Sequence, residues 1–441
     1  MSSTGEKRRP IEILDAAPMV WRQWLVVVIC ILAMALDGYD VMSISLAGAG
    51  ITQEWGLTKA ELGFLLPLEF IGMAIGLIFI GTLTDLYGRR LVFLLCLIII
   101  TVGMAGSGYA FNMETLAASR VFTGLGIGGM MASATALSSE YSNAKNRSLT
   151  VIMVAGGYTF GIYLASQFSG MLLEGGDWRS IFTFGAWISF AFIPVVLFLV
   201  PESIGFLERR RPEGFEEKLG KTLAQLGHDE GFDASAPAAD TEEKISPMRL
   251  FEGDTRRITI IMMICYLGNI LTYYYFVKWM PAAVTDIGYT AVEGTRVLGM
   301  ISIGGLTGSI AMAVASRVIN LKHLMIFCLM GSAISVAAFP FFTGTLTMML
   351  IAGTLAGFFL FAVIGGAFGL FAYAFPPAVL GSGVGVVLGT GRGGAVVGPW
   401  AGGLLFAAGM SLYVVSPIMA LGSFMGAVAL LFLPKQSGSD V

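Results

Sequence analysis

The sequence Gly81-Thr-Leu-Thr-Asp85-Leu-Tyr-Gly88-Arg89-Arg90 joins two apolar runs, at about 62–83 and 91–110. Each run is long enough to cross a membrane as a helix, which takes about 20 mostly apolar residues. The glycines allow a tight turn and a close approach of helices, and the arginines hold a loop at the cytoplasmic face. Asp85 is placed to meet a helix N-terminus or an arginine. This segment therefore predicts a short cytoplasmic turn between two membrane-spanning helices.

The composition of the whole chain agrees with this prediction. The 441 residues are 56% hydrophobic and 12% charged, whereas soluble proteins are about 25% charged. This excludes a cytosolic enzyme, a disordered chain and a secreted domain. The net charge of −3 gives no indication of nucleic-acid binding. The 58 glycines fit membrane helices that pack closely.

Twelve apolar runs predict an all-α polytopic membrane protein with twelve transmembrane helices. A polar segment separates two groups of six and predicts a partly helical cytoplasmic linker. The predicted spans are 24–46, 62–83, 91–110, 115–138, 149–173, 181–200, 258–280, 293–316, 324–342, 346–373, 379–408 and 411–433. The predicted domains are an N-terminal segment at 1–23, six-helix halves at 24–203 and 258–434, a linker at 204–257 and a tail at 435–441.

Lysine and arginine give the orientation, because they are enriched in cytoplasmic loops. With the N-terminus inside, 20 of the 26 Lys and Arg residues fall in inward segments and four in outward ones. The outward residues are Lys59, Arg179, Lys278 and Arg296. We therefore expect both termini to be cytoplasmic.

The two halves also resemble each other in sequence. A shift of 233 residues places Gly124 on Gly357 and Gly161 on Gly394, and Pro201 lands on Pro434. Six spans duplicated in the same orientation give halves related by an axis along the membrane normal, with a substrate site between them at mid-membrane.

The Gly81–Arg90 segment resembles the GxxxDxxGRR signature of the major facilitator superfamily. The resemblance implies that Gly81, Asp85, Gly88, Arg89 and Arg90 form a gate latch that favours the outward-open state. Glu140, at the end of the fourth span, is the expected partner of an arginine in this segment. The alternative is a cytoplasmic loop that is merely positively charged.

Leu36-Asp37-Gly38-Tyr39-Asp40 places two carboxyl groups near the middle of the first span. Each ionised carboxylate there costs roughly 2.5–3.5 kcal/mol on insertion scales. The spacing i, i+3 puts both on one helix face, where two close carboxylates do not both ionise easily. Protonatable groups of this kind are what proton coupling needs, so Asp37 and Asp40 are candidate proton carriers. The alternative is a structural pair that neighbouring helices saturate.

This DGxD element resembles the hallmark of the aromatic acid:H⁺ symporter family within that superfamily. The resemblance runs over essentially all twelve spans and implies import of benzoate-like acids with protons. The family pattern also has an arginine in the eleventh span, which is Arg392 within Gly389-Thr-Gly391-Arg392-Gly-Gly-Ala395. A guanidinium suits a carboxylate because its fork binds both oxygens. Arg392 thus either binds the substrate anion or pairs with Asp37 or Asp40, and the two can alternate.

Arg120-Val-Phe-Thr-Gly124-Leu-Gly126 in the fourth span resembles the superfamily RxxxGxG motif, which is linked to proton transfer. We expect either proton coupling or a structural ion pair at Arg120. Glu69, in the second span, is a further buried carboxylate.

Aromatic and polar side chains supply candidate substrate contacts. Asn269, Thr272 and Tyr273 share one helix face in the seventh span, and Lys278 with Trp279 better fits an aromatic belt at the membrane surface. The further candidates are Tyr39, Tyr158, Gln167, Phe368 and Tyr373.

Together these features predict a bacterial inner-membrane symporter of aromatic carboxylates, driven by the proton gradient and working as a monomer. We expect no cofactor, no metal site and no catalytic residue, because the chain has no GxSxG, no HExxH and only two histidines. The alternatives are a symporter of another organic acid, such as a muconate or a sialate, an exporter, or a membrane sensor.

Overall fold

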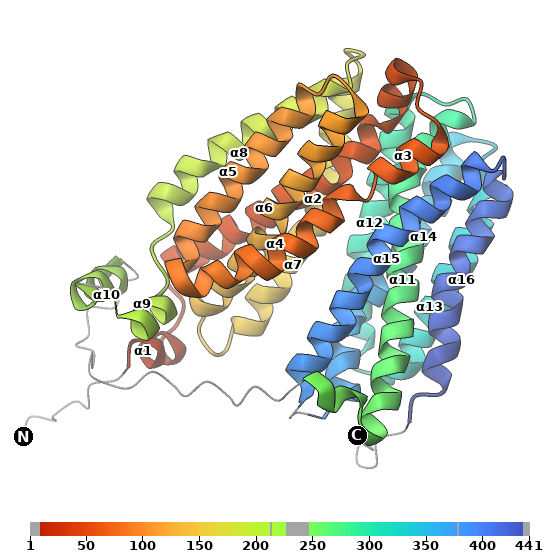
Figure 1. Ribbon diagram of the computed structural model, residues 1–441. Helices are drawn as coiled ribbons and strands as arrows, with labels where there is room; N and C mark the ends of the chain where they lie inside the picture. Colours follow the sequence, from red (N-terminus) through yellow and green to blue (C-terminus); the bar gives the residue numbers. More distant parts are fainter. Residues whose placement is uncertain (1–8, 212–213, 226–246, 377–378, 435–441) are drawn as a thin grey trace, which may run out of the picture.

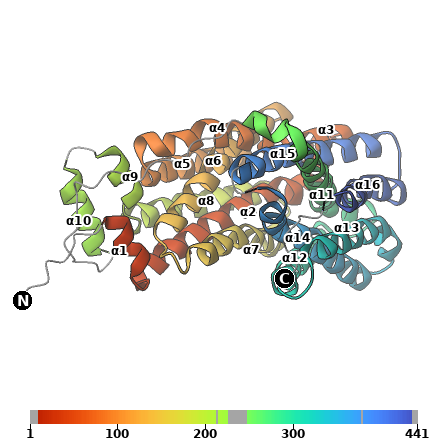
Figure 2. The same ribbon diagram turned by 90° about the horizontal axis from the view of Figure 1, so that it is seen from below.

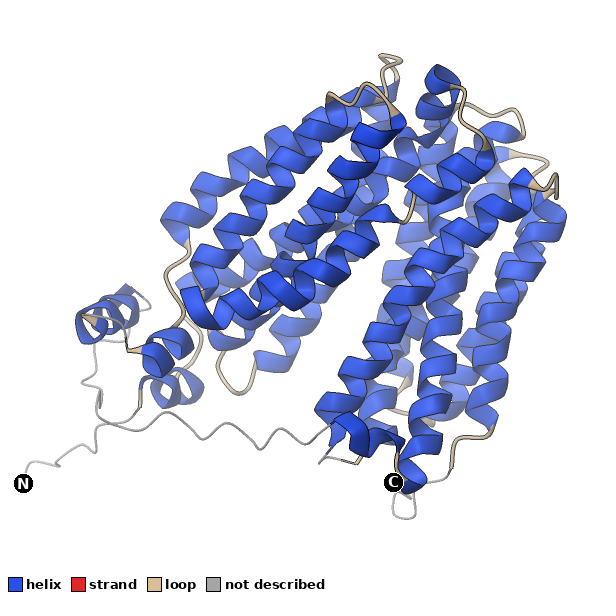
Figure 3. Ribbon diagram, in the orientation of Figure 1, coloured by secondary structure: helices blue, strands red, loops and turns tan. Residues whose placement is uncertain are grey.

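The computed structural model describes residues 9–211, 214–225, 247–376 and 379–434. Figure 3 shows only helices, turns and loops in this part of the chain. Twelve of its helices are long and apolar enough to cross a membrane. The predicted twelve-span helical fold is therefore confirmed.

The helices form two bundles, with short helical pieces beside them (Figure 1). The N-terminal half contains α2 (Trp21–Trp55), α3 (Lys59–Leu65), α4 (Leu68–Tyr87), α5 (Arg89–Gly108), α6 (Met113–Glu140), α7 (Arg147–Leu173) and α8 (Arg179–Leu199). The C-terminal half contains α11 (Gly253–Asp286), α12 (Ala291–Ala315), α13 (Leu321–Ala338), α14 (Leu346–Ala374), α15 (Leu380–Ala407) and α16 (Leu412–Leu431). The short elements are α1 (Pro10–Ala16), α9 (Ile204–Arg210), α10 (Phe215–Gln225), η1 (Pro247–Phe251) and η2 (Phe339–Phe342).

The largest differences from the prediction lie in the first, second and seventh spans. The first extends to Trp55, nine residues beyond the predicted end. The second is divided into α3 and α4 at Pro67, which cannot donate a backbone hydrogen bond within a helix. The seventh begins at Gly253, five residues before the predicted start, because its first turn is polar and extends beyond the apolar run. Of the predicted linker, 204–257, residues 226–246 lie outside the described part of the chain.

The two halves repeat the same helix packing. A Cβ added at Gly124 of α6 would lie 2.1 Å from the Glu69 carbonyl oxygen of α4. One added at Gly357 of α14 would lie 2.0 Å from the Ile301 carbonyl oxygen of α12. Both glycines therefore let two backbones touch. Since they are related by the 233-residue shift, the internal repeat seen in the sequence corresponds to matching helix pairs in the structure.

The halves meet at one end of the molecule and diverge toward the other (Figure 1), and Figure 2 shows them side by side from below. We call the end where α2 and α11 finish the outer end, and the opposite end the inner end, following the predicted orientation. At the outer end, Lys59 Nζ of α3 lies 2.5 Å from Asp286 Oδ1 of α11. One hydrophobic core includes residues of both halves, whereas the core at the inner end of the second half contains none from the first. The structure is thus closed at its outer end.

Gly63 and Gly403 bring the backbones of the two halves into close contact at this end. A Cβ added at Gly63 of α3 would lie 2.7 Å from the Gly403 Cα of α15. We expect Gly63→Val to weaken outer closure by about 1–3 kcal/mol, the usual cost of overpacking, which is roughly a 5- to 150-fold shift in the conformational equilibrium. The measurement is the labelling rate of a cysteine introduced beside Gly403. Gly344→Val is the control, since its added Cβ meets no atom within 4 Å; equal rates in the two variants would contradict the prediction.

Candidate functional site

Four charged side chains form a buried cluster near the outer end. Arg120 Nη2 of α6 donates to Asp40 Oδ1 of α2 and to Glu69 Oε2 of α4, both at 2.6 Å. Lys278 Nζ of α11 donates to Glu69 Oε1 and to the Val41 carbonyl oxygen. No member has more than 2% of its side chain exposed. We call Asp40, Glu69, Arg120 and Lys278 the outer ion cluster; it carries two positive and two negative charges.

The position of Lys278 corrects the sequence analysis. From the sequence, Lys278 was predicted to be an outward loop residue and to lie with Trp279 in a surface belt. In the structure both side chains are buried, and Trp279 Nε1 donates to the Pro399 carbonyl oxygen at 2.8 Å. The reason is that α11 continues to Asp286, so Lys278 lies two turns inside the helix end. Lys278 is the member of the outer ion cluster that comes from the C-terminal half.

Asp37 lies one helical turn from Asp40, toward the inner end. Its side chain is fully buried. Among the described residues, neither oxygen of Asp37 has a hydrogen-bond partner, and the same holds for Asp40 Oδ2. A buried carboxyl group without a partner is far less costly when neutral than when ionised. The two aspartates of the motif therefore differ: Asp40 belongs to an ion pair and Asp37 does not.

Arg392 lies halfway along α15, where its guanidinium reaches the other half of the molecule. Its Nη2 lies 3.2 Å from Met131 Sδ of α6, and the side chain is half-buried. Among ion pairs between described residues, none includes Arg392. The ion pair between Arg392 and Asp37 or Asp40, the alternative considered from the sequence, is thus not formed in this structure. Asp40 is bound by Arg120 instead.

Glycines flank Arg392 in the sequence of α15, and they leave space beside its side chain. A Cβ added at Gly389 or Gly393 would meet no atom within 4 Å, so there is open space on this face of α15. On the other face, a Cβ at Gly391 would lie 2.4 Å from the ring of Tyr266, so glycine lets that ring lie against the helix. A guanidinium in this setting can receive a planar anion.

Tyrosines of both halves meet in the middle of the bundle. The hydroxyl groups of Tyr158 in α7 and Tyr274 in α11 are 3.4 Å apart. The Tyr274 ring packs 4.4 Å from Phe70, between ring centroids, and Tyr273 packs 4.9 Å from Phe361. Tyr273 is buried, and its hydroxyl has no partner among the described residues. This aromatic cluster contains two of the predicted contact residues, Tyr158 and Tyr273.

The structure places the other predicted contact residues apart from this cluster. Tyr39 donates to the Ile181 carbonyl oxygen at 2.8 Å and packs against α8. Asn269 is buried between α11, α14 and α16, where its Oδ1 accepts from Ser423 Oγ at 3.3 Å. Gln167 faces Gly299 of α12 at the junction of the halves. Phe368 is 56% exposed, and Tyr373 packs at the inner end of α14.

At the inner end, the predicted gate residues form contacts within the N-terminal half. Gly88 has φ +101°, a conformation that favours glycine, and a Cβ there would meet Glu202. Glu202 Oε1 accepts from the backbone N–H of Arg90 at 3.2 Å, and burial raises the pKa of Glu202, an effect that its backbone hydrogen bonds oppose. Glu140 Oε1 lies 3.1 Å from Arg89 Nη2, so the expected pairing of Glu140 is present.

Asp85 and Gly81 are the remaining predicted gate residues. The side chain of Asp85 lies outside the described part of the structure. Gly81 lies in α4, where an added Cβ would make an ordinary contact of 3.6 Å with Ala132. Thr84 Oγ1, one turn further along α4, accepts from Arg89 Nη1 at 2.9 Å. The arginines of the segment are thus held by their own half in this state.

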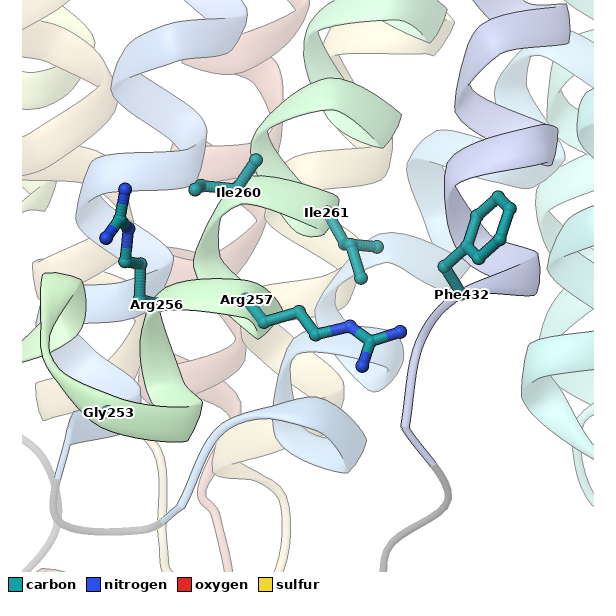
Figure 4. A pocket seen from close by; sticks show the side chains of 6 residues that line it. All are labelled: Gly253, Arg256, Arg257, Ile260, Ile261 and Phe432. Carbon is teal, nitrogen blue, oxygen red and sulfur yellow. The ribbon is translucent and has the colours of Figure 1, made fainter.

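A surface groove of about 440 Å³ lies at the inner end of α11, away from these residues (Figure 4). Arg256 and Arg257 extend to opposite sides of the helix there, beside Ile260, Ile261 and Phe432. Within the described residues, no group of three or more His, Cys, Asp or Glu side chains is arranged to hold a metal ion.

Sequence reasoning missed the roles of Lys278, Tyr274 and Met131 in this region. A lysine inside a span that faces three other buried charges is a usable signal, since intramembrane charges pair with one another. This signal was not used, because Lys278 was predicted to be exposed. Tyr274 and Met131 carry no such signal, because aromatic and apolar residues are abundant along the whole chain.

A family model described as Major Facilitator Superfamily matches residues 30–322. The chain belongs to this superfamily, and the family resemblance read from its motifs is confirmed. Membership makes the protein a multi-pass membrane transporter rather than an enzyme.

The relatives are similar along nearly their full length. The gallate transporter of Pseudomonas putida is 27% identical over 432 residues, which cover 96% of this chain and 95% of that protein. The 4-hydroxybenzoate transporter PcaK of Pseudomonas aeruginosa is also 27% identical, with 97% and 96% covered. The niacin transporter NiaP of Acinetobacter baylyi is 26% identical, with 83% and 84% covered.

Solved structures support the fold alone. A crystal structure of a D-xylose-proton symporter has a TM-score of 0.70 at 16% identity, covering 95% of this chain and 99% of that one. A partially occluded inward open conformation of the xylose transporter XylE from E. coli has a TM-score of 0.72 at 16% identity, covering 96% and 100%.

Proposed function

We propose that the protein is a proton-coupled symporter that imports an aromatic carboxylate across the bacterial inner membrane. The observation that carries the proposal is Arg392: a half-buried guanidinium at mid-membrane, in contact with the opposite half, beside open space and with no acidic partner among the described residues. Such a group is well placed to bind an anion. The names of the relatives, which include gallate, 4-hydroxybenzoate and benzoate transporters, give the class of anion.

The aromatic cluster supports an aromatic cargo. Rings pack against one another at centroid separations of about 4.5–7 Å, and Tyr158, Tyr274 and Tyr273 also offer hydroxyl groups to a ring substituent. We propose that the carboxylate binds Arg392 and that the ring lies between the tyrosines of α7 and α11. Because these residues come from both halves, the ligand holds the halves together, as alternating access at a midplane site requires.

Asp37 and Asp40 are the proposed proton carriers. Asp37 is supported by its complete burial without a hydrogen-bond partner, and Asp40 by its pairing with Arg120. At the inner end, we propose that Gly88, Arg89, Arg90 and Glu140 belong to a gate, since Arg89 donates to Glu140 and the Arg90 N–H donates to Glu202 beside the turn at Gly88.

The test is uptake of labelled 4-hydroxybenzoate into proteoliposomes with and without an acid-outside pH gradient. One proton with one monoanion is electroneutral, so we expect about tenfold accumulation per pH unit. Protein-free vesicles are the control, because the neutral acid crosses a bilayer unaided. Passive entry and symport reach the same equilibrium, so the initial uptake rate is compared. If the protein vesicles take up label no faster than these, this cargo is wrong, and competition by dicarboxylates and sugar acids then identifies the class.

A further inference from the structure

The outer ion cluster connects the two halves through Lys278. Its other three members belong to α2, α4 and α6, so they move together as parts of the N-terminal half. Lys278 reaches them from α11 and makes two contacts, with Glu69 Oε1 and with the Val41 carbonyl oxygen. When the halves separate at the outer end, α11 must carry Lys278 away from both acceptors.

That separation changes the charge of the cluster. With Lys278 in place, two cations balance two carboxylates. Without it, the N-terminal half retains the carboxylates of Asp40 and Glu69 and a single cation, Arg120. The Nη2 of Arg120 donates to both carboxylates. One uncompensated negative charge then remains within a helix bundle in the membrane, where such charges are costly. One proton from the outer medium restores neutrality among these three side chains.

We propose that Lys278 and the transported proton neutralise the Glu69–Asp40 carboxylates in turn: the proton binds Glu69 when the outer end is open, and Lys278 displaces it on closure. This inference rests on the proposed proton coupling and adds Glu69 and Lys278 to the residues that carry it. Glu69 is faced by Asp40, Arg120 and Lys278. The hydroxyl groups of Tyr158 and Tyr274 also lie within its electrostatic reach.

The displaced proton has acceptors toward the inner end. Asp40 Oδ2 and both oxygens of Asp37 have no hydrogen-bond partner among the described residues. Asp37 lies three residues before Asp40, about 4.5 Å along the helix toward the inner end. As Lys278 arrives, the Glu69 carboxyl therefore loses its proton and the ionised carboxylate of Asp37 gains it. Asp40 stays ionised beside Arg120, and the net charge of the N-terminal half is unchanged until the proton leaves on the inner side.

Spin labels across the outer end test this without any substrate. Glu174→Cys follows α7 in one half and Gly344→Cys precedes α14 in the other; both positions are exposed, and the four native cysteines are buried. In the parent protein we expect the short interlabel distance at pH 5 and at pH 8, because Lys278 balances the cluster. In Lys278→Met, closure requires a proton, so the long-distance population rises at least tenfold from pH 5 to pH 8.

The charge-neutral double variant Lys278→Met/Glu69→Gln gives the matched control. Arg120 then balances Asp40 alone, so we expect the short distance at both pH values. In transport, this variant is expected to retain 4-hydroxybenzoate exchange at equal pH and to lose accumulation driven by a pH gradient. It also keeps the proposal testable if Lys278→Met alone does not fold.

Two outcomes overturn the proposal. One is a pH-independent distance in Lys278→Met equal to that of the parent protein, and the other is full gradient-driven accumulation by the double variant. Either leaves the proposed function intact. By contrast, the parent protein could move no 4-hydroxybenzoate at all while the interlabel distances behave as expected. That result would refute the proposed substrate and support the exchange of Lys278 for a proton.

Discussion

Replacing Arg392 by alanine is expected to abolish accumulation of 4-hydroxybenzoate and to weaken its binding by a large factor. Truncating one partner of a buried, hydrogen-bonded charge pair costs about 2–5 kcal/mol, which corresponds to roughly 30- to 5,000-fold in Kd. The affinity of Arg392→Lys should lie between those of the parent protein and Arg392→Ala, because an ammonium keeps the charge but loses the fork that binds both carboxylate oxygens. The measurement is equilibrium binding of labelled 4-hydroxybenzoate to purified protein.

The substrate series makes this prediction specific to the carboxylate. The parent protein should bind 4-hydroxybenzoate far better than its neutral amide, and Arg392→Ala should bind the two about equally. Arg256→Ala is the matched control: it removes an exposed arginine from the same half, in the inner-end groove of Figure 4. A variant at position 392 that still prefers the carboxylate would show that another cation binds it.

Asp37→Asn is expected to uncouple transport from the proton gradient while leaving the fold intact. The carboxyl group of Asp37 has no hydrogen-bond partner among the described residues, so its neutral amide isostere breaks no interaction. Exchange of 4-hydroxybenzoate at equal pH should continue, and the increase in initial uptake rate that a pH gradient gives above protein-free vesicles should disappear. Uptake into proteoliposomes with and without a gradient measures both quantities.

Asp40→Asn provides the contrast within the same helix. It removes one partner from a fully buried ion pair with Arg120, and breaking such a pair typically costs about 3–5 kcal/mol. We therefore expect a lower apparent unfolding temperature for Asp40→Asn than for Asp37→Asn. The proton-carrying role fails if both variants retain pH-driven accumulation.

The spans and the repeat were predictable because each depends on patterns along a single chain. Apolar runs of membrane length define helices whatever their neighbours are, and paired glycines such as Gly124 and Gly357 mark equivalent packing sites. The pairing of Glu140 with Arg89 was also predictable, since both lie at the ends of adjacent spans.

The pairings inside the membrane were not predictable to the same extent. The sequence indicated that Asp40, Glu69, Arg120 and Arg392 are buried charges, but the identity of their partners depends on which helix faces which. Arg120 binds two carboxylates, which leaves Arg392 without either. Lys278 was misplaced because the predicted span ends at 280, before Pro281, whereas α11 continues through Pro281 to Asp286.

Substrate-driven proton movement tests the central claim of proton-coupled carboxylate transport most directly. Proteoliposomes that contain a pH-sensitive dye are prepared without a pH gradient, and 4-hydroxybenzoate is added outside. Symport predicts an initial rate of internal acidification well above that of protein-free vesicles and of Arg392→Ala vesicles. Labelled substrate that enters through the parent protein with no acidification beyond these controls would contradict proton coupling.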